Sequence, residues 1–235
     1  DRPAEGEPMD HDHEADRAHE AVPGHLGGTS RSMTVDAGTG PDTSTGAGPG
    51  PGPAMVLRRH YDADVADVWQ ACTDPERLAR WLTPVSGELR PGGRYQLAGN
   101  AGGQILRCEP PRLLVVSWEA PGDQPVTRVT AELTPAGAGT DFELRHSGPV
   151  DPAFWARFGP GAVGVGWDLA LFGLALHLAG TDRPQQVAGP PSAAYRDLVT
   201  GSSAAWQAAA EAAGTPAGQA KAAADRTAAF YLPPA

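Results

Sequence analysis

The chain has 235 residues, which is enough for one domain with appendages. Hydrophobic residues make up 40% of it and support a buried core, whereas 30 glycines and 24 prolines indicate irregular segments. The net charge of −10 is unevenly placed, because residues 1–53 hold ten of the 28 acidic residues but three of the 18 basic ones. The remainder is nearly neutral and has no basic tract, which argues against nucleic-acid binding.

Several common sites are missing from the sequence. The two cysteines belong to no CxxC pair, and no charged, apolar and small-residue signal segment opens the chain, so we predict a cytoplasmic protein. No zinc-ligand spacing, phosphate loop or nucleophile triad can be read, so we predict neither a metal nor a cofactor. Gly159, Gly161 and Gly164 match GxGxxG, but no strand precedes them as a dinucleotide site requires.

Residues 1–53 show no apolar periodicity and pass from an acidic, histidine-bearing part to GTGPDTSTGAGPGPGP. Such a segment cannot bury enough apolar surface to offset the entropy lost on ordering. We therefore predict that residues 1–53 form a disordered tail.

Residues 55–61 (MVLRRHY) are typical of a first strand. Two short helices should follow, the first capped by Asp64 and the second begun by Asp74-Pro75 and stopped by Pro84. From Gly87 the apolar period changes to two, and glycine and proline clusters separate short strand-like runs. The alternation is clearest in residues 129–133 and 141–147, which predict an antiparallel meander with one face exposed to water.

Residues 154–178 (FWARFGPGAVGVGWDLALFGLALHL) are apolar over most of a helical circumference, so we expect a long helix that is buried almost all round. Its length approaches that of a membrane span. However, Asp168 would cost about 2.5–3.5 kcal/mol near mid-span, so a buried helix in a protein without a membrane span is the better interpretation.

Residues 183–235 follow as a linker and an alanine-rich helical extension. Helices are expected from Ser192 to Val199, from Ser203 to Ala213, and from Pro216 through Phe230. Their aromatic residues suggest packing on the domain, on a second copy in a homodimer, or on a protein partner.

The predicted fold is therefore α+β: a curved antiparallel sheet of about six to seven strands grips a long C-terminal helix, with two short helices after strand 1. Three runs carry a resemblance, namely DPERLARWLTPVSGELRPGGRY, GGQILRCEPPRLLVVSWE and GVGWDLALFGLALHL. Over about residues 54–182 the chain resembles the START-like helix-grip (SRPBCC) superfamily. Within it, the chain is similar to the bacterial branch related to the C-terminal domain of the activator of the heat-shock protein 90 ATPase.

The resemblance implies a cavity between the long helix and the concave face of the sheet. Two polar side chains are candidates for chemistry there. His146 alternates onto the inward face, where it could act as an acid or base or could simply be hydrogen-bonded. Asp168 would need a partner such as Arg107 or Arg145 if it faces the sheet, unless it lies on a partly exposed edge of the helix. Residues expected to line the cavity, or else to be plain core, are Trp81, Tyr95, Trp118, Phe142, His146, Trp155, Phe158, Trp167 and Phe172.

Three functions remain open from the sequence. The leading hypothesis is a non-enzymatic protein that binds a small hydrophobic or amphipathic molecule in the cavity. The first alternative is an enzyme similar to polyketide aromatases and cyclases, in which His146 and Asp168 would steer proton transfer. The second is a chaperone-associated interaction module that uses the outer sheet or the C-terminal helices.

Overall fold

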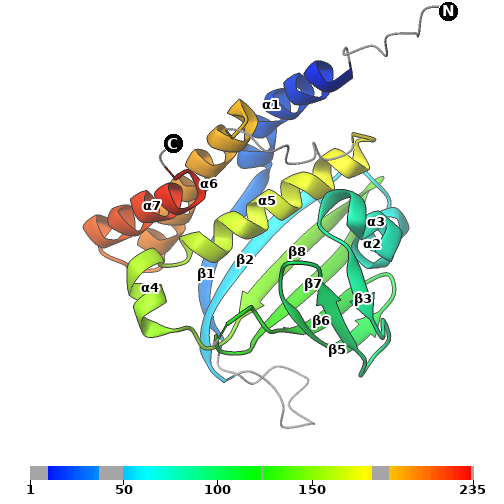
Figure 1. The fold of residues 1–235 in the computed structure, drawn as a ribbon, viewed down its shortest axis with the longest axis horizontal. Coiled ribbons are helices and arrows are strands. Elements are labelled where there is room, and N and C mark those ends of the chain that lie inside the picture. The colour runs from blue at the N-terminus through cyan, green and yellow to red at the C-terminus, as the bar shows by residue number, and fades with distance from the viewer. Residues whose placement is uncertain (1–9, 37–49, 123, 182–190, 234–235) are drawn as a thin grey trace, which may run out of the picture.

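A computed structural model describes residues 10–36, 50–122, 124–181 and 191–233, and an eight-stranded antiparallel sheet runs through this part of the chain (Figure 1). The strand order is β1-β2-β8-β7-β6-β5-β4-β3. The strands are β1 (Thr29–Asp36), β2 (Gly52–Tyr61), β3 (Val85–Gly87), β4 (Arg94–Leu97), β5 (Gly102–Glu109), β6 (Leu113–Trp118), β7 (Thr127–Ala136) and β8 (Gly139–Ser147).

The α+β architecture predicted from the sequence is confirmed. In the central pair, Val129 of β7 lies opposite His146 of β8, and Leu133 lies opposite Phe142. All four side chains are buried, because alternate residues of each strand turn toward the helical layer. The sheet has eight strands instead of the expected six to seven, because β1 comes from the segment that was predicted to be disordered.

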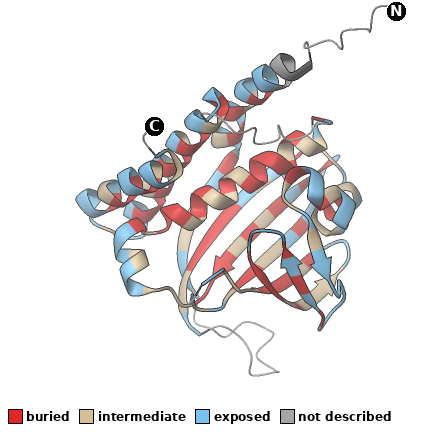
Figure 2. Cartoon of the chain, in the orientation of Figure 1, coloured by how far each residue is buried: buried red, intermediate tan, exposed pale blue. Residues whose placement is uncertain are grey.

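Seven helices accompany the sheet within the described residues, and Figure 1 shows α5 lying across the hollow side of the sheet. Figure 2 shows that buried residues run along most of α5, whereas α4 is largely exposed. The helices are α1 (Asp10–Gly28), α2 (Val65–Thr73), α3 (Pro75–Trp81), α4 (Pro152–Phe158), α5 (Gly161–Leu178), α6 (Ala193–Ala212) and α7 (Ala217–Tyr231).

The two short helices form as their capping residues predict. The Asp64 carboxylate accepts hydrogen bonds from the backbone N–H groups of Ala66 and Asp67, each at 2.9 Å. Asp74 caps α3 in the same way, with Pro75 in the first helical turn. Each carboxylate satisfies amide donors that have no partner inside the helix.

The apolar helix α5 has the length and composition of a membrane span, but 61% of its 18 residues are buried inside the protein. It is a core helix. The prediction of one rod over residues 154–178 was wrong, because the chain breaks at Gly159-Pro160 into α4 and α5. Gly159 adopts φ 54° and ψ −141°, a backbone conformation that favours glycine, and Pro160 has no N–H to continue the ladder of α4.

The prediction of a disordered tail was wrong for residues 10–36, which form α1 and β1; residues 1–9 and 37–49 lie outside the described residues. Strand β1 pairs with β2 residue for residue from Thr29–Arg59 to Asp36–Gly52. Helix α1 buries Ala18 and Val22 in a second apolar cluster against α5 and α6. This segment lacks apolar periodicity, but it is ordered because β1 pairs with the edge of the sheet and α1 packs through a small apolar face.

The alanine-rich extension packs on the domain in the same chain. Helix α6 is continuous over Ala193–Ala212, where two helices were expected, and α7 follows as predicted. Trp206 of α6 is only 1% exposed. Its indole lies directly over Gly164 of α5, so that a Cβ on Gly164 would come within 2.3 Å of the ring. The predicted linker falls mostly on residues 182–190, outside the described part of the chain.

This close approach predicts the effect of adding one methyl group. Gly164→Ala should destabilise the protein by about 1–3 kcal/mol, because Trp206 has to shift within a packed interface. Gly218→Ala in α7 is the matched control, since its Cβ would meet no atom within 4 Å, and it should stabilise the helix by about 0.5–1 kcal/mol. Urea unfolding of both variants measures the difference. Equal stabilisation by the two substitutions would contradict the packing of α6 on α5.

Candidate functional site

A cavity of about 380 Å³ lies between the amino-terminal half of α5, α4 and the inner face of the sheet. Its wall is mainly apolar and includes the side chains of Trp118, Phe154, Trp155 and Trp167. Polar groups are few, which is typical of sites for small molecules. The other described residues that line it are Pro53, Met55, Leu82, Asn100, Ala120, Gln124, Pro125, Thr127, His146, Ser147, Gly148, Pro149, Val150, Asp151, Ala162, Val163, Gly166, Ala170 and Tyr231.

Three rings form one side of the cavity. The centroids of Trp118 and Trp167 are 5.0 Å apart, and His146 lies about equally far from both, at 6.0 Å and 5.9 Å. The three residues come from β6, α5 and β8, so that the sheet and the helix both contribute to the wall. These distances are those of favourable tilted and edge-to-face ring pairs.

Both ring nitrogens of His146 are engaged. The indole N–H of Trp167 donates to Nδ1 at 2.9 Å, so Nδ1 is the acceptor. The proton therefore sits on Nε2, which donates to the Thr127 hydroxyl oxygen at 2.7 Å. Thr127 in turn donates to the Trp118 carbonyl at 3.3 Å. This chain of hydrogen bonds requires the neutral imidazole.

Burial agrees with that assignment, since desolvation lowers the pKa of His146 to about 4. At neutral pH the ring carries no charge and has no free lone pair. It can offer its face to a bound molecule, but it has to break an existing hydrogen bond before it accepts a proton. This geometry corresponds to the structural interpretation of His146 rather than the acid–base one.

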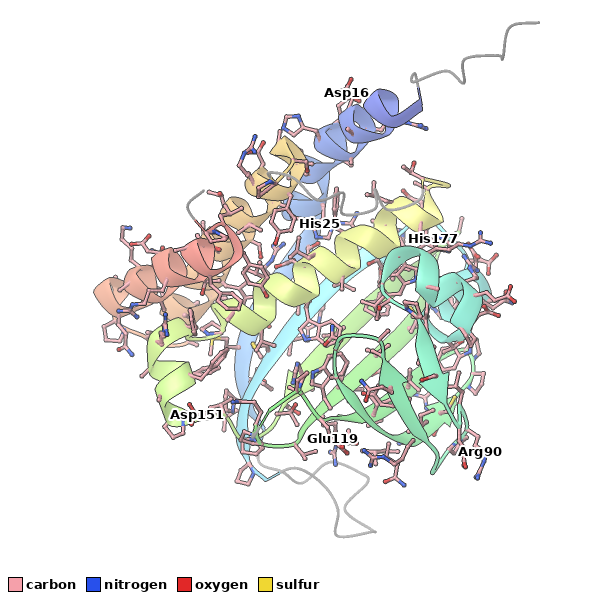
Figure 3. The ribbon with its side chains drawn as sticks, viewed as in Figure 1. Asp16, His25, Arg90, Glu119, Asp151 and His177 are labelled. Carbon is pink, nitrogen blue, oxygen red and sulfur yellow. The ribbon has the colours of Figure 1, made fainter. Side chains whose placement is uncertain are left out.

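Asp168 lies on the opposite side of α5, away from the cavity. Its carboxylate is fully buried and accepts hydrogen bonds from Arg31 (Nη2 at 2.7 Å and Nε at 2.9 Å), from Ser202 Oγ at 2.6 Å and from Trp206 Nε1 at 3.0 Å. His25 approaches with Nε2 at 3.7 Å. We call Asp168, Arg31, His25, Ser202 and Trp206 the Asp168 cluster. Figure 3 shows His25 on the side of α5 that faces away from the sheet.

The expected partners of Asp168 were wrong, because Arg31 of β1 takes the place of Arg107 or Arg145. Burial by itself raises the pKa of Asp168, but the polar contacts of His25, Arg31 and Ser202 outweigh it and hold the pKa below the ordinary value. Burial also lowers the pKa of His25, whose Nδ1 accepts a hydrogen bond from Arg59 at 2.9 Å. The Asp168 cluster is charged and hydrogen-bonded, and it connects β1, α5 and α6.

The structure brings four of the residues predicted for the site into the cavity wall: Trp118, His146, Trp155 and Trp167. Others lie elsewhere in the protein. Phe158 faces a separate space of about 40 Å³ between α4, α6 and α7. Phe172 points away from the sheet into the cluster with α1. The remaining three are core residues outside the cavity wall: Trp81, Tyr95 and Phe142.

Sequence reasoning missed several wall residues. Thr127 shares the inward face of β7 with Val129, and this alternation could have shown it. Phe154 was inside the apolar run, but the helix break that turns it to the cavity was not predicted. Tyr231 comes from α7, and its hydroxyl donates to the Ala162 carbonyl at 2.6 Å. No local signal marks Tyr231 as a cavity residue.

Residues 62–179 match the family described as Activator of Hsp90 ATPase homolog 1-like protein. The chain belongs to this family. CalU16 from Micromonospora echinospora is similar in its crystal structure (38% identity, TM-score 0.54, 64% of this chain and 86% of that one). It is also similar in its solution structure (35% identity, TM-score 0.62, 78% and 96%). A search of curated proteins gives no match.

The family assignment confirms the resemblance read from the sequence, including the SRPBCC helix-grip fold. The matched segment contains β6, β8 and the whole of α5, which together supply the ring triad of the cavity, namely Trp118, His146 and Trp167. Pro53, Met55 and Tyr231 lie outside the matched segment but line the same cavity. Segments on both sides of the matched domain therefore also contribute residues to the cavity wall.

Proposed function

We propose that this protein binds a small hydrophobic or amphipathic molecule in the cavity between α5, α4 and the sheet. The observation that supports the proposal is an apolar, ring-lined space of about 380 Å³ beside the packed core. Its volume is in the range of sites that enclose drug-sized ligands. Polar groups of the wall, such as those of Asn100 and Ser147, would accommodate a polar end of the molecule.

The geometry gives less support to the aromatase and cyclase alternative. That mechanism requires two groups that act on one substrate, whereas His146 and Asp168 are on opposite sides of α5. His146 is also held neutral by two hydrogen bonds, and Asp168 is held ionised by Arg31. An acid–base pair needs groups within reach of the same reacting atoms.

The interaction-module alternative would use the outer sheet or the C-terminal helices. In this structure α6 and α7 pack against α5 and α4 of their own chain, with Trp206 and Ala224 buried there. A partner would therefore bind their outer faces, where Phe230 is 60% exposed. A homodimer through these helices and a cytoplasmic location stay predictions.

Filling the cavity tests the proposal. Val163 lines it from the first turn of α5, so Val163→Phe should occupy part of the space and weaken binding of an apolar aromatic probe by about tenfold or more. N-phenylnaphthylamine is a suitable probe, since energy transfer from Trp118 and Trp167 would report its binding. Leu169→Phe, on the same helix but outside the cavity wall, is the matched control.

Leu169→Phe should bind the probe as the parent protein does. Thermal unfolding of both variants would show that each is folded. Equal affinity in Val163→Phe and in the parent protein would overturn this location of the site. Absence of binding to the parent protein, by this probe and by an apolar compound library, would overturn the function itself.

A further inference from the structure

The charge of the cavity wall bears on which amphipathic molecules the site would receive. Among the described residues that line it, none is lysine or arginine, and Asp151 and His146 are the two acidic or basic side chains. His146 is neutral, for the reasons given above. Asp151 accepts a hydrogen bond from the Phe154 backbone N–H at 2.7 Å and so caps α4 (Figure 3). The described wall therefore offers one negative charge and no positive one.

The nearest arginines in the sequence do not change this balance. Arg128 and Arg145 are next to Thr127 and His146, but strand alternation turns their side chains toward the other face of the sheet. Arg145 donates to the Thr34 hydroxyl of β1 at 3.2 Å and approaches Glu143 at 3.6 Å. Neither arginine lines the cavity.

One feature of the site favours anions. The amino end of α5 reaches the cavity through Ala162 and Val163, and a helix amino terminus attracts negative charge. At a partly exposed site this effect changes affinity by about fivefold. An anionic group that leaves water for an apolar site and meets no cation there loses its hydration free energy. This loss lowers the affinity by far more than fivefold. Desolvation therefore outweighs the helix dipole.

Rings contribute most of the large side chains of the wall. Trp118, Trp155, Trp167, Phe154 and Tyr231 come from four different elements and surround the space. Flat aromatic surfaces stack on one another with offset or edge-to-face geometry, which favours ring-containing ligands over flexible alkyl chains.

We propose that the cavity selects ring-containing molecules without a negative charge and rejects carboxylates and sulfonates of the same size, fatty acids included. This inference rests on the proposed function, since it names the chemical class of the bound molecule. The wall supplies stacking surfaces and a carboxylate but no cation, so an anionic group would lose its hydration without gaining a partner.

A matched pair of dyes tests the inference on the full chain. N-phenylnaphthylamine and anilinonaphthalenesulfonate share the same ring system and differ by the sulfonate. The neutral dye should bind at least about tenfold more tightly than the sulfonate. Val163→Phe identifies the signal that comes from the cavity, because only binding at that site should fall in this variant.

A cation added at the rim should reverse the selection. Gln124 is an exposed residue of the wall, and Gln124→Lys should tighten sulfonate binding by about fivefold while leaving the neutral dye unchanged. Gln70→Lys on α2, exposed and outside the wall, should change neither affinity.

The outcomes separate the two proposals. Equal or tighter binding of the sulfonate at the cavity of the parent protein would overturn the charge selection and leave the proposed function standing. An unchanged sulfonate affinity in Gln124→Lys would also count against the charge selection. Binding of neither dye, nor of any member of an apolar library, would overturn both.

Discussion

Replacing Arg31 by methionine is expected to destabilise the folded protein by about 3–5 kcal/mol. The Arg31 side chain is 4% exposed, and its guanidinium holds the fully buried Asp168 carboxylate with two hydrogen bonds shorter than 3 Å. Without it the carboxylate would remain buried with Ser202, Trp206 and His25 as its nearest polar neighbours. The free energy of unfolding from urea titrations measures the loss.

A second arginine on the neighbouring strand provides the control. Arg58 of β2 pairs with Glu143 at 2.7 Å, but its side chain is 52% exposed. Arg58→Met should therefore cost no more than about 1 kcal/mol. Adding Asp168→Asn to Arg31→Met removes the unpaired charge and should restore part of the stability. Similar losses for Arg31→Met and Arg58→Met would show that the Asp168 cluster is not buried as described.

Acidification should destabilise the protein through His146. Its pKa is lowered from 6.5 to about 4 in the folded state, so between these values the unfolded chain binds more protons than the folded one. Stability is therefore fully present above pH 6.5 and is lost as the pH falls toward 4. The total contribution is about 3 kcal/mol, of which about 2 kcal/mol should disappear between about pH 7.5 and about pH 5.

Two glutamine variants isolate this contribution. His146→Gln retains a donor and an acceptor for Thr127 and Trp167 but does not titrate, so its unfolding free energy should fall less over the same pH interval. His60→Gln makes the same substitution at an exposed histidine, which contacts Asp141, and is the matched control. His25 is also buried with a lowered pKa and adds a loss of the same sign in all three proteins. Parallel pH profiles for His146→Gln and the parent protein would contradict the assignment.

The parts of the fold that the sequence predicted are those with a local physical signal. Alternation over residues 129–133 and 141–147 predicted β7 and β8, because side chains of a half-buried strand repeat every two residues. The continuous apolar surface of α5 predicted a helix covered on all sides. Asp64 and Asp74 predicted two helix starts, since a carboxylate at that position binds free amide donors.

The features that were missed depend on contacts between distant residues. Arg31 and Asp168 are 137 positions apart, and nothing near either one indicates the pairing. Strand β1 is held by the edge of β2, so its order comes from the partner rather than from its own composition. Helix α1 buries Ala18, Val22 and His25 instead of a stripe of large apolar residues, which is why periodicity did not reveal it.

The candidate site was predicted in part for the same reason. His146 was placed on the inward face by strand alternation, whereas Trp118 and Trp167 were assigned to the cavity through the family resemblance. The three residues meet at the cavity. Phe172 was assigned to the cavity through the resemblance, and the apolar pattern of α5 did not show which buried face of the helix meets the cavity. The helix has two, and only tertiary structure decides which residues meet the sheet and which meet α1 and α6.

Consecutive residues of α5 serve these two faces. Trp167 belongs to the ring triad of the cavity and donates a hydrogen bond to His146, and Asp168 binds Arg31 of β1 and Ser202 of α6 on the far side. A rotation or shift of the helix that moves one side chain must move the other. Occupancy of the cavity and attachment of the amino-terminal segment would then be reciprocally linked, so each would alter the equilibrium constant of the other by the same factor.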